Sequence, residues 1–527
     1  MPEHLPGSAL AAAQLAVEGV DTVFAIPGVH NVHLCDALLD QPGIDVFTGR
    51  HEQGLGFMAN GYTRASGRIA VPLVISGPGV TNVLTALADA YVDSVPMVLI
   101  AAGCDTRYLG KGAFHELRDQ TQSLASVTKW NGRADQASEV PDLIRTAFEQ
   151  ARAGRPGPTA VEIPMDTQTD LGAADIRPSN QPPRFGADAP SVEDAATRLA
   201  AARTPVIYAG QGAVISGAGD ELVALAERLD APCVTTALAK GVMPETHQLS
   251  LGFGLRREPV RRTLTEADVV LVVGSSLDEA ATDGWRLQLP DDTIQIDIAA
   301  EVIGLTNPVA VGLHGDAKIV LQQLLDRLGP ELGPKGARRE LLEGLRAEER
   351  AELRDDSGWQ YMQAIQSTLA DDGIVTNDAA TANSWALKYL TRTMPRTLNI
   401  TSNLGALGFA LPAAVGAKVA FPDRQVLAIV GDGGFLFNDH ALSTAVQHQL
   451  GVVTIVFNDN CYSSIKSQQQ ALFGRTVATD LVNPDFALLA AAYGARGAIA
   501  RTPDELLAAL EMAWEQPGPT VIEVPLP

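Results

Sequence analysis

The sequence predicts an α/β protein built from three doubly wound parallel sheets, for two reasons. Short runs rich in valine and isoleucine alternate with helical stretches, which is typical of parallel strands flanked by helices. The chain has 527 residues, more than one hydrophobic core usually accommodates. A proline-rich linker at 172–191 and a charged stretch at 329–358, which we expect to be a solvated helix, interrupt the pattern. We therefore expect three domains, at residues 1–172, 190–330 and 356–527.

The composition argues against several classes of protein. Lys and Arg number 39 against 62 Asp and Glu, a formal charge of −23 that disfavours binding to nucleic acid or to an anionic membrane. No apolar run approaches the roughly 20 residues of a membrane span. The four cysteines form no CxxC pair, which fits a reducing compartment. We expect a cytoplasmic protein without nucleic-acid or membrane partners.

The two outer units share an order of elements: a strand, a Gly-x-Gly turn, a helix and a second strand. In the first unit AVPLVIS precedes the turn 77–79, and in the last unit QVLAIV precedes the turn 431–433. Two ordinary βαβ units would give the same order. Only the residues at the two turns can therefore indicate a function.

The last unit carries the pattern of a phosphate and metal site. Asp432 follows a buried strand, and the glycines beside it, Gly433 and Gly434, let backbone N–H groups converge on phosphate oxygens. The next strand ends in a second oxygen-rich turn with Asp459, 27 positions after Asp432. Mg²⁺ prefers about six oxygen ligands. The two carboxylates, the Cys461 carbonyl and phosphate oxygens would supply them, although Gly-Asp-Gly alone is also ordinary turn chemistry.

This GDG motif, followed at that spacing by Asn-Asp-Asn, resembles the thiamine-diphosphate-dependent enzymes of the acetolactate synthase, benzoylformate decarboxylase and pyruvate decarboxylase group. The family has two asparagines in the second turn, and here Asp459 replaces the second, which adds a negative charge to the metal site. The resemblance covers essentially the whole chain. It implies a pyrimidine-binding first domain, a central domain and a diphosphate-binding last domain, with thiamine diphosphate and Mg²⁺ as cofactors.

The segment RHEQGLGFMANGYTRASG resembles the family segment that carries its activating glutamate. By position alone, Glu52 is an acid at a helix start that interacts with the helix dipole. The resemblance implies instead that Glu52 hydrogen-bonds N1′ of the cofactor's aminopyrimidine and promotes removal of the thiazolium C2 proton, which leads to a C2 ylide and an enamine. Gly54, Gly56 and Gly61 within this helix suggest close approach of another helix or a ligand.

Further cofactor contacts follow from the resemblance. In TSNLGALGFALPAAVGAK, Leu407 matches the apolar residue that forces the cofactor to bend, and Gly405 matches the carbonyl that accepts from its 4′-amino group. As an alternative, Leu407 is only a core residue. Thr381 and Tyr462 are expected to contact the cofactor near its diphosphate.

The substrate side is expected to involve Val29, His30, His115 and Ile465. Val29 and His30 stand where related enzymes line the thiazolium, and either histidine could transfer protons near neutral pH, although a histidine is as often structural. Pyruvate decarboxylase has an acidic residue at the position of Ile465, six residues after Asp459. Release of an aldehyde by the pyruvate decarboxylase route is therefore less supported.

The resemblance implies a 2-oxo acid decarboxylase or an acetolactate-synthase-like carboligase, with a 2-oxo acid as substrate and an aldehyde or second 2-oxo acid as acceptor. IPGVHN, RHEQGLGFMANGY and FHEL also resemble the 5-guanidino-2-oxopentanoate decarboxylase branch. A homodimer or homotetramer with active sites between subunits is expected. The alternatives are an FAD-dependent oxidase and a non-catalytic relative; the GQGAVISGAG turn is compatible with FAD, but FAD is not predicted.

Overall fold

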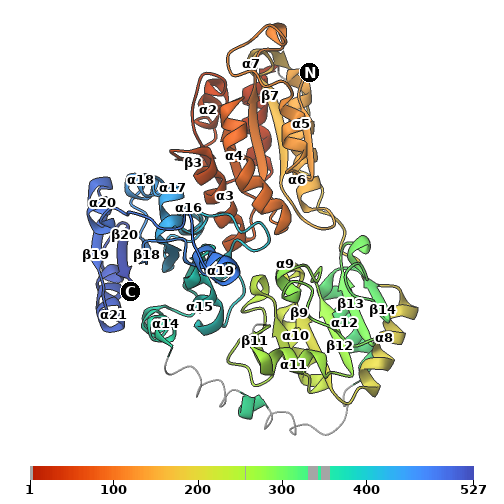
Figure 1. Cartoon of the computed structure of the whole chain (residues 1–527). Coiled ribbons are helices and arrows are strands. Elements are labelled where there is room, and N and C mark those ends of the chain that lie inside the picture. Colours follow the sequence, from red (N-terminus) through yellow and green to blue (C-terminus); the bar gives the residue numbers. More distant parts are fainter. Residues whose placement is uncertain (1–3, 256, 330–341, 346–355, 527) are drawn as a thin grey trace.

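The computed structural model describes residues 4–255, 257–329, 342–345 and 356–526. It contains three six-stranded parallel sheets, one in each of three domains, with helices on their faces (Figure 1). The predicted fold class is therefore confirmed. Most of the expected charged helix between the second and third domains lies outside the described residues.

The first domain has the strand order β3-β2-β4-β5-β7-β6. Its strands are β2 (Thr22–Ala25), β3 (Asp45–Thr48), β4 (Val71–Val74), β5 (Val98–Gly103), β6 (Trp130–Arg133) and β7 (Thr159–Pro164). Its helices are α1 (Gly7–Val17), α2 (Val32–Leu38), α3 (Glu52–Ser66), α4 (Pro78–Val92), α5 (Gln120–Ala125), α6 (Val140–Arg152) and α7 (Met165–Thr169). Two short antiparallel strands, β1 (Leu5–Pro6) and β8 (Leu171–Gly172), close the domain.

The central domain has the order β11-β10-β9-β12-β13-β14. Its strands are β9 (Pro205–Ala209), β10 (Cys233–Thr235), β11 (Ser250–Phe253), β12 (Val269–Val273), β13 (Thr293–Asp297) and β14 (Val311–His314). Its helices are α8 (Ala189–Ala201), α9 (Gln211–Ser216), α10 (Gly219–Leu229), α11 (Glu258–Thr265) and α12 (Ala317–Leu328). Residues 173–188 lead into it without helix or strand, as the proline-rich composition predicts.

The last domain has the order β16-β15-β17-β18-β20-β19. Its strands are β15 (Ile374–Asn377), β16 (Leu398–Ile400), β17 (Val426–Gly431), β18 (Val452–Asn458), β19 (Arg496–Ile499) and β20 (Thr520–Pro525). Its helices are α14 (Ser357–Thr368), α15 (Thr381–Tyr389), α16 (Ala410–Ala420), α17 (Asp432–Asn438), α18 (Ala441–Gln447), α19 (Ser463–Phe473), α20 (Phe486–Tyr493) and α21 (Pro503–Glu515). Counted within each domain, the strand order equals that of the first domain, so the likeness of the outer units extends to their topology.

The first and last domains pack together through α3 and α16. Buried residues of both helices belong to one hydrophobic cluster that spans the two domains. Glycines allow the two backbones to approach closely: a Cβ on Gly61 would lie 2.1 Å from the Ala413 carbonyl oxygen, and one on Gly416 would lie 1.8 Å from that of Met58. Close approach of another helix thus explains Gly61, as the sequence suggested. The helix α3 ends at Gly67, whose φ of 75° is a left-handed conformation that glycine adopts readily.

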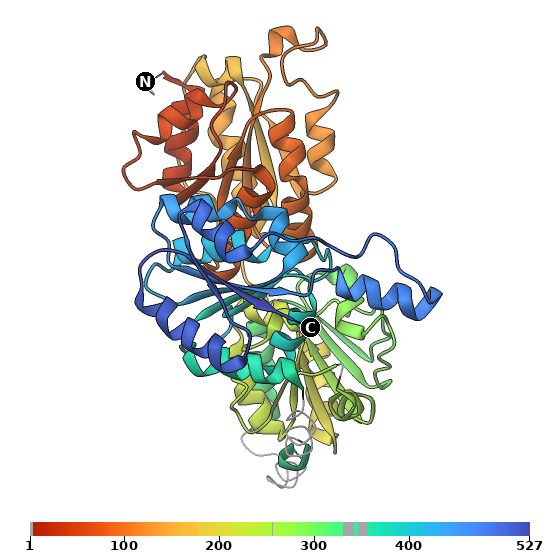
Figure 2. The same cartoon turned by 60° about the vertical axis from the view of Figure 1, so that its left-hand side comes forward.

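One helix of the last domain stands apart from the rest. Figure 2 shows α19 as a blue helix projecting from the body of the molecule, and none of its residues is buried. Within the described part of the chain, no helix is both long and apolar enough to cross a membrane.

Candidate active site

The candidate residues of the last domain follow three neighbouring strands. Parallel pairing of β15 with β17 and of β17 with β18 brings the carboxyl ends of these strands to one edge of the sheet. Thr381 follows β15, Asp432 follows β17 and Asp459 follows β18. The chain turns away in opposite directions from β15 and β17, and ligands of open α/β sheets bind at such points.

Asp432 is 3% exposed and begins α17. Its Oδ1 accepts from the N–H of Gly433 at 2.8 Å, and its Oδ2 accepts from Asn483 Nδ2 at 2.6 Å. The same Asn483 amide donates to Asn458 Oδ1 at 2.9 Å. Burial raises the pKa of the Asp432 carboxyl, and the negative charge of Asp459 adds to this rise. Oxygens of two adjacent strand ends thus converge on one donor, an arrangement that fits a hard cation such as Mg²⁺.

The second turn is organised by Asp459. Its Oδ1 accepts from the N–H of Cys461 at 3.2 Å, and its Oδ2 accepts from the Ser463 hydroxyl at the start of α19. Tyr462 packs against the first turn, because a Cβ on Gly433 would lie 2.4 Å from its ring. Among the described residues, no group of three or more His, Cys, Asp and Glu side chains forms a metal site by itself. A cation here would therefore depend on amide, backbone and phosphate oxygens as well.

The loop 401–408, between β16 and α16, lies beside these turns. Gly405 is exposed with a φ of 61°, and Leu407 is half-buried. The N–H of Gly408 donates to Asp378 Oδ2 at 2.8 Å, and the same oxygen would lie 2.7 Å from a Cβ on Gly434. Asp378 is fully buried, and burial raises its pKa to about 6. This carboxyl joins the loop to the GDGG turn, a role that sequence reasoning missed although Asp378 lies only three residues before Thr381.

In the first domain, Glu52 lies at the start of α3 and is 9% exposed. The ring of His51 caps the helix by accepting from the N–H of Gln53 at 3.1 Å. Asn82 of α4 donates to Glu52 Oε2 at 2.9 Å. Two helices therefore fix this carboxylate. Sequence reasoning missed Asn82, because a single asparagine inside a helix gives no motif.

The structure brings His30 and His115 together. Their rings stack with centroids 5.1 Å apart, and His30 Nε2 lies 3.0 Å from the Phe114 carbonyl oxygen. Burial lowers the pKa of His30, which favours the neutral imidazole. The Nδ1 atoms of both rings are buried without a partner among the described residues. Val29, beside them, is 61% exposed.

The candidate residues lie in different domains of the chain. Among the described residues, no hydrogen bond joins Glu52 to the Asp432 turn, and the two groups belong to different domains (Figure 1). Ile465 lies in the first turn of the projecting α19 and is 49% exposed. We call Glu52 and the Asp432 turn the two candidate half-sites.

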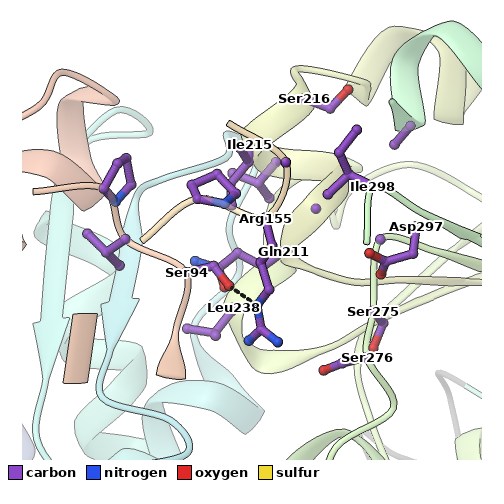
Figure 3. A pocket seen from close by; sticks show the side chains of 18 of the residues that line it. Ser94, Arg155, Gln211, Ile215, Ser216, Leu238, Ser275, Ser276, Asp297 and Ile298 are labelled. Carbon is purple, nitrogen blue, oxygen red and sulfur yellow. Dashed lines mark hydrogen bonds between the residues drawn. The ribbon is translucent and has the colours of Figure 1, made fainter. Parts of the chain in front are cut away.

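A cavity of about 600 Å³ lies where the central domain meets both outer domains. Figure 3 shows Arg155 and Ser94 of the first domain on one side of it and Asp297, Ser275 and Ser276 of the central domain on the other. Arg155 Nε donates to Ser94 Oγ at 2.7 Å, and burial raises the pKa of Asp297.

The glycines of the GQG turn at this cavity are explained without a ligand. A Cβ on Gly212 would lie 2.7 Å from the Cα of Gly274. The backbones that follow β9 and β12 can therefore approach each other only because Gly212 and Gly274 lack side chains. The turn is therefore no independent indication of a dinucleotide.

Comparison with known proteins agrees with this geometry. Residues 6–123 match the family described as "Thiamine pyrophosphate enzyme, N-terminal TPP binding domain", residues 192–324 match its central domain, and residues 378–524 match its C-terminal TPP binding domain. The protein therefore belongs to the thiamine pyrophosphate (thiamine diphosphate) enzymes. The predicted family is confirmed, and the chain has both cofactor-binding domains.

Its relatives include a "Probable 2-ketoarginine decarboxylase" of Pseudomonas aeruginosa, 38% identical over 97% of this chain and 92% of that protein. A "Probable acetolactate synthase large subunit" of Methanocaldococcus jannaschii is 33% identical over 97% of this chain and 90% of that protein. The acetolactate synthase isozyme 3 large subunit of Escherichia coli is 33% identical over 98% of this chain and 93% of that protein. The chain is thus an enzyme of the decarboxylase and acetolactate synthase type.

Proposed function

We propose that the protein is a thiamine-diphosphate- and Mg²⁺-dependent decarboxylase of a 2-oxo acid, with carbon–carbon bond formation as a second fate of the substrate. The observation that carries this proposal is the buried Glu52 carboxylate, fixed by α3 and by Asn82. A carboxyl held in this way can share a proton with a ring nitrogen. When bound, thiamine diphosphate would supply the nucleophilic carbon and the electron sink for loss of CO₂.

The last domain would hold the other end of the cofactor. Asp432, Asp459 and the Cys461 carbonyl are the proposed Mg²⁺ ligands, and the oxygens that already converge on Asn483 support this assignment. Thr381 and the turn formed by Gly433, Gly434 and Tyr462 would contact the diphosphate. Gly405 would accept a hydrogen bond from the aminopyrimidine, and Leu407 would hold the cofactor bent.

The paired histidines would act on the substrate. Burial lowers the pKa of His30 and so favours its neutral imidazole, and its Nδ1, which has no partner among the described residues, could accept a proton; His115 would lie beside it in the same site. Val29 and Ile465, both exposed in the single chain, would line the substrate site.

The half-sites would meet between subunits of a homodimer or homotetramer. Glu52 and the Asp432 turn lie on separate domains, and apolar side chains near α17 are exposed, with Leu436 at 39% and Phe437 at 46%. A second copy that covered them would unite Glu52 with the Asp432 turn. Sedimentation of the purified protein tests this, and a fully active monomer would refute it.

For the substrate, we propose a 2-oxo acid longer than pyruvate, with 2-ketoarginine as the first candidate because of the relative at 38% identity. The test is a panel of 2-ketoarginine, pyruvate and 2-oxobutanoate, each with and without an acceptor aldehyde, with products identified by mass spectrometry. We expect CO₂ and the aldehyde one carbon shorter from 2-ketoarginine. Acetolactate from pyruvate as the preferred product would refute this substrate, and no turnover in the panel would support a non-catalytic relative.

A flavin-dependent oxidase is the second candidate, and the cavity beside Asp297 favours it because it lies at the carboxyl ends of the central strands. The visible absorbance of the purified protein distinguishes the two candidates. A flavin spectrum together with consumption of O₂ during turnover would support the oxidase.

A further inference from the structure

A buried ionic cluster lies in the first domain where α3 and α4 meet. The Arg64 guanidinium contacts Asp89 Oδ2 at 3.0 Å and Asp93 Oδ2 at 2.8 Å, and each of the three side chains is at most 4% exposed. Asn60 Nδ2 donates to Asp89, and Asn60 Oδ1 accepts from Arg64 Nε. We call Arg64, Asp89 and Asp93 the Arg64 cluster. Two carboxylates thus face one guanidinium, and buried charges are costly unless further hydrogen bonds compensate them.

Those further hydrogen bonds come from the last domain. Thr401 Oγ1 donates to Asp89 Oδ1 at 2.5 Å, and the backbone N–H groups of residues 402 and 403 donate to Asp93 at 3.0 and 3.3 Å. The same Thr401 hydroxyl accepts from the N–H of Ala406 at 3.1 Å, which closes the loop on itself. One domain therefore holds the backbone of a loop that belongs to the other.

The loop is fastened at its far end by the same cluster. The Arg64 guanidinium lies 5.4 Å from the ring centroid of Phe409, which directly precedes α16 and is fully buried. Gly405, with its positive φ, and the half-buried Leu407 lie between these two sets of contacts. A loop with a flexible glycine needs such external contacts to keep one conformation, because ordering it costs conformational entropy.

We propose that Asp89 and Asp93, held by Arg64, are positioning residues that fix the loop 401–408 and thereby place Gly405 and Leu407 against the cofactor. The inference rests on the proposed function, which assigns Gly405 and Leu407 to the cofactor. The first domain would then serve two cofactors: Glu52 would reach the one held by the last domain of the partner subunit, while Asp89 and Asp93 shape the cofactor-bending loop of the last domain in their own chain.

The charge of Asp89 and the conformation of the loop 401–408 depend on each other. Burial raises the pKa of Asp89, whereas Arg64 and the Thr401 hydroxyl act against that rise and favour the carboxylate. Loss of the Thr401 hydroxyl would remove one of these partners and free the Ala406 N–H at once. Thr401 is therefore the best position for a test, because a change there leaves the charges of the cluster in place.

The test compares Thr401→Val, Thr401→Ser and Thr397→Val in the full-length protein. Thr397 is a matched control: it is 1% exposed, lies in the same domain, and its hydroxyl likewise donates one hydrogen bond, to the Met394 carbonyl, and accepts one, from Arg392 Nε. Each variant is measured for the rate of H/D exchange at C2 of bound thiamine diphosphate, for the cofactor dissociation constant, and for thermal unfolding.

We expect Thr401→Val to slow C2 exchange by about tenfold to a hundredfold, the usual effect of misplaced reacting groups. Thr401→Ser should restore exchange, and Thr397→Val should exchange at the wild-type rate even where it lowers the unfolding temperature as much. Equal exchange rates in Thr401→Val and Thr397→Val would overturn the inference while the proposed function stands. Absence of exchange in the wild-type protein would refute the proposed function and this inference with it.

Discussion

The substitution Gly416→Ala tests how closely the first and last domains are packed. An alanine inside a helix normally stabilises it by about 1 kcal/mol relative to glycine. Here the added Cβ would lie 1.8 Å from the carbonyl oxygen of Met58, 2.7 Å from its carbonyl carbon and 2.9 Å from the N–H nitrogen of Tyr62. These are backbone atoms of α3 and cannot turn aside, so the two helices must separate.

The magnitude follows from this geometry. Ordinary carbon–oxygen contacts lie at about 3.3 Å or more, so α3 and α16 must move apart by roughly 1.5 Å. Overpacking of this kind costs about 3 kcal/mol at the upper end of the usual range, and the helix preference of alanine offsets about 1 kcal/mol. The free energy of unfolding should therefore fall by about 2 kcal/mol. For a domain of about 150–250 residues, this corresponds to a fall in unfolding temperature of about 4–8 °C.

Thermal unfolding followed by circular dichroism measures this fall. The matched control is Gly43→Ala, because a Cβ on Gly43 meets nothing within 4 Å and the residue is exposed. The control should stay within about 0.5 kcal/mol of wild type. A Gly416→Ala protein as stable as the control would show that α3 and α16 are not in backbone contact.

Asp459→Ala removes a proposed Mg²⁺ ligand whose charge also acts on Asp432, and a metal titration should show a Mg²⁺ requirement raised by about tenfold to a hundredfold; an unchanged requirement would contradict the metal assignment. Burial raises the pKa of Asp378 to about 6, so its contribution to stability is present below its unfolded pKa and is lost as pH rises through 6. The unfolding temperature of Asp378→Asn relative to wild type should therefore rise between about pH 4 and pH 7, and a constant difference would contradict this. Glu116 accepts from three backbone N–H groups of the loop before His115, chiefly that of Gly110, and these lower its pKa. If these hydrogen bonds order the 105–119 loop, proteolysis of the loop should accelerate in Glu116→Gln. Equal cleavage rates in the variant and the wild type would show that Glu116 does not order it.

The strand ends could be predicted from the sequence because their turn residues are distinctive. Glycines next to Asp432, and Asp459 after a run of buried aliphatic residues, indicate both the end of a strand and its chemistry. The helix start at Glu52 was predicted for the same reason. The structure places each of these residues where the pattern indicates, while their roles toward the cofactor stay predictions.

The partners that hold these residues could not be predicted. Asn82 and Asn483 are single asparagines in a helix and a loop, and nothing in their neighbourhood in the sequence connects them to Glu52 or Asp432. The glycines of α3 indicated close contact with other elements, but only the tertiary structure identifies these as α16 for Gly61 and α4 for Gly56.

The Arg64 cluster was missed for a related reason. Arg64 and Asp89 lie on two different helices, Asp93 directly follows the second, and charged residues on helices are usually exposed. Their burial depends on the loop of another domain, and its hydrogen bonds connect residues more than 300 positions apart. Such long-range compensation leaves no local signal in the sequence.

If Glu52 activates thiamine diphosphate in this protein, its replacement must slow H/D exchange at C2 of the bound cofactor. Exchange is measured in quenched samples of wild type and Glu52→Gln, each saturated with thiamine diphosphate and Mg²⁺. Glutamine keeps the shape of the side chain and the contact with Asn82 but cannot share a proton with the cofactor. We predict that Glu52→Gln folds and binds the cofactor while its exchange falls to nearly the rate of free thiamine diphosphate. Exchange at the wild-type rate would contradict it.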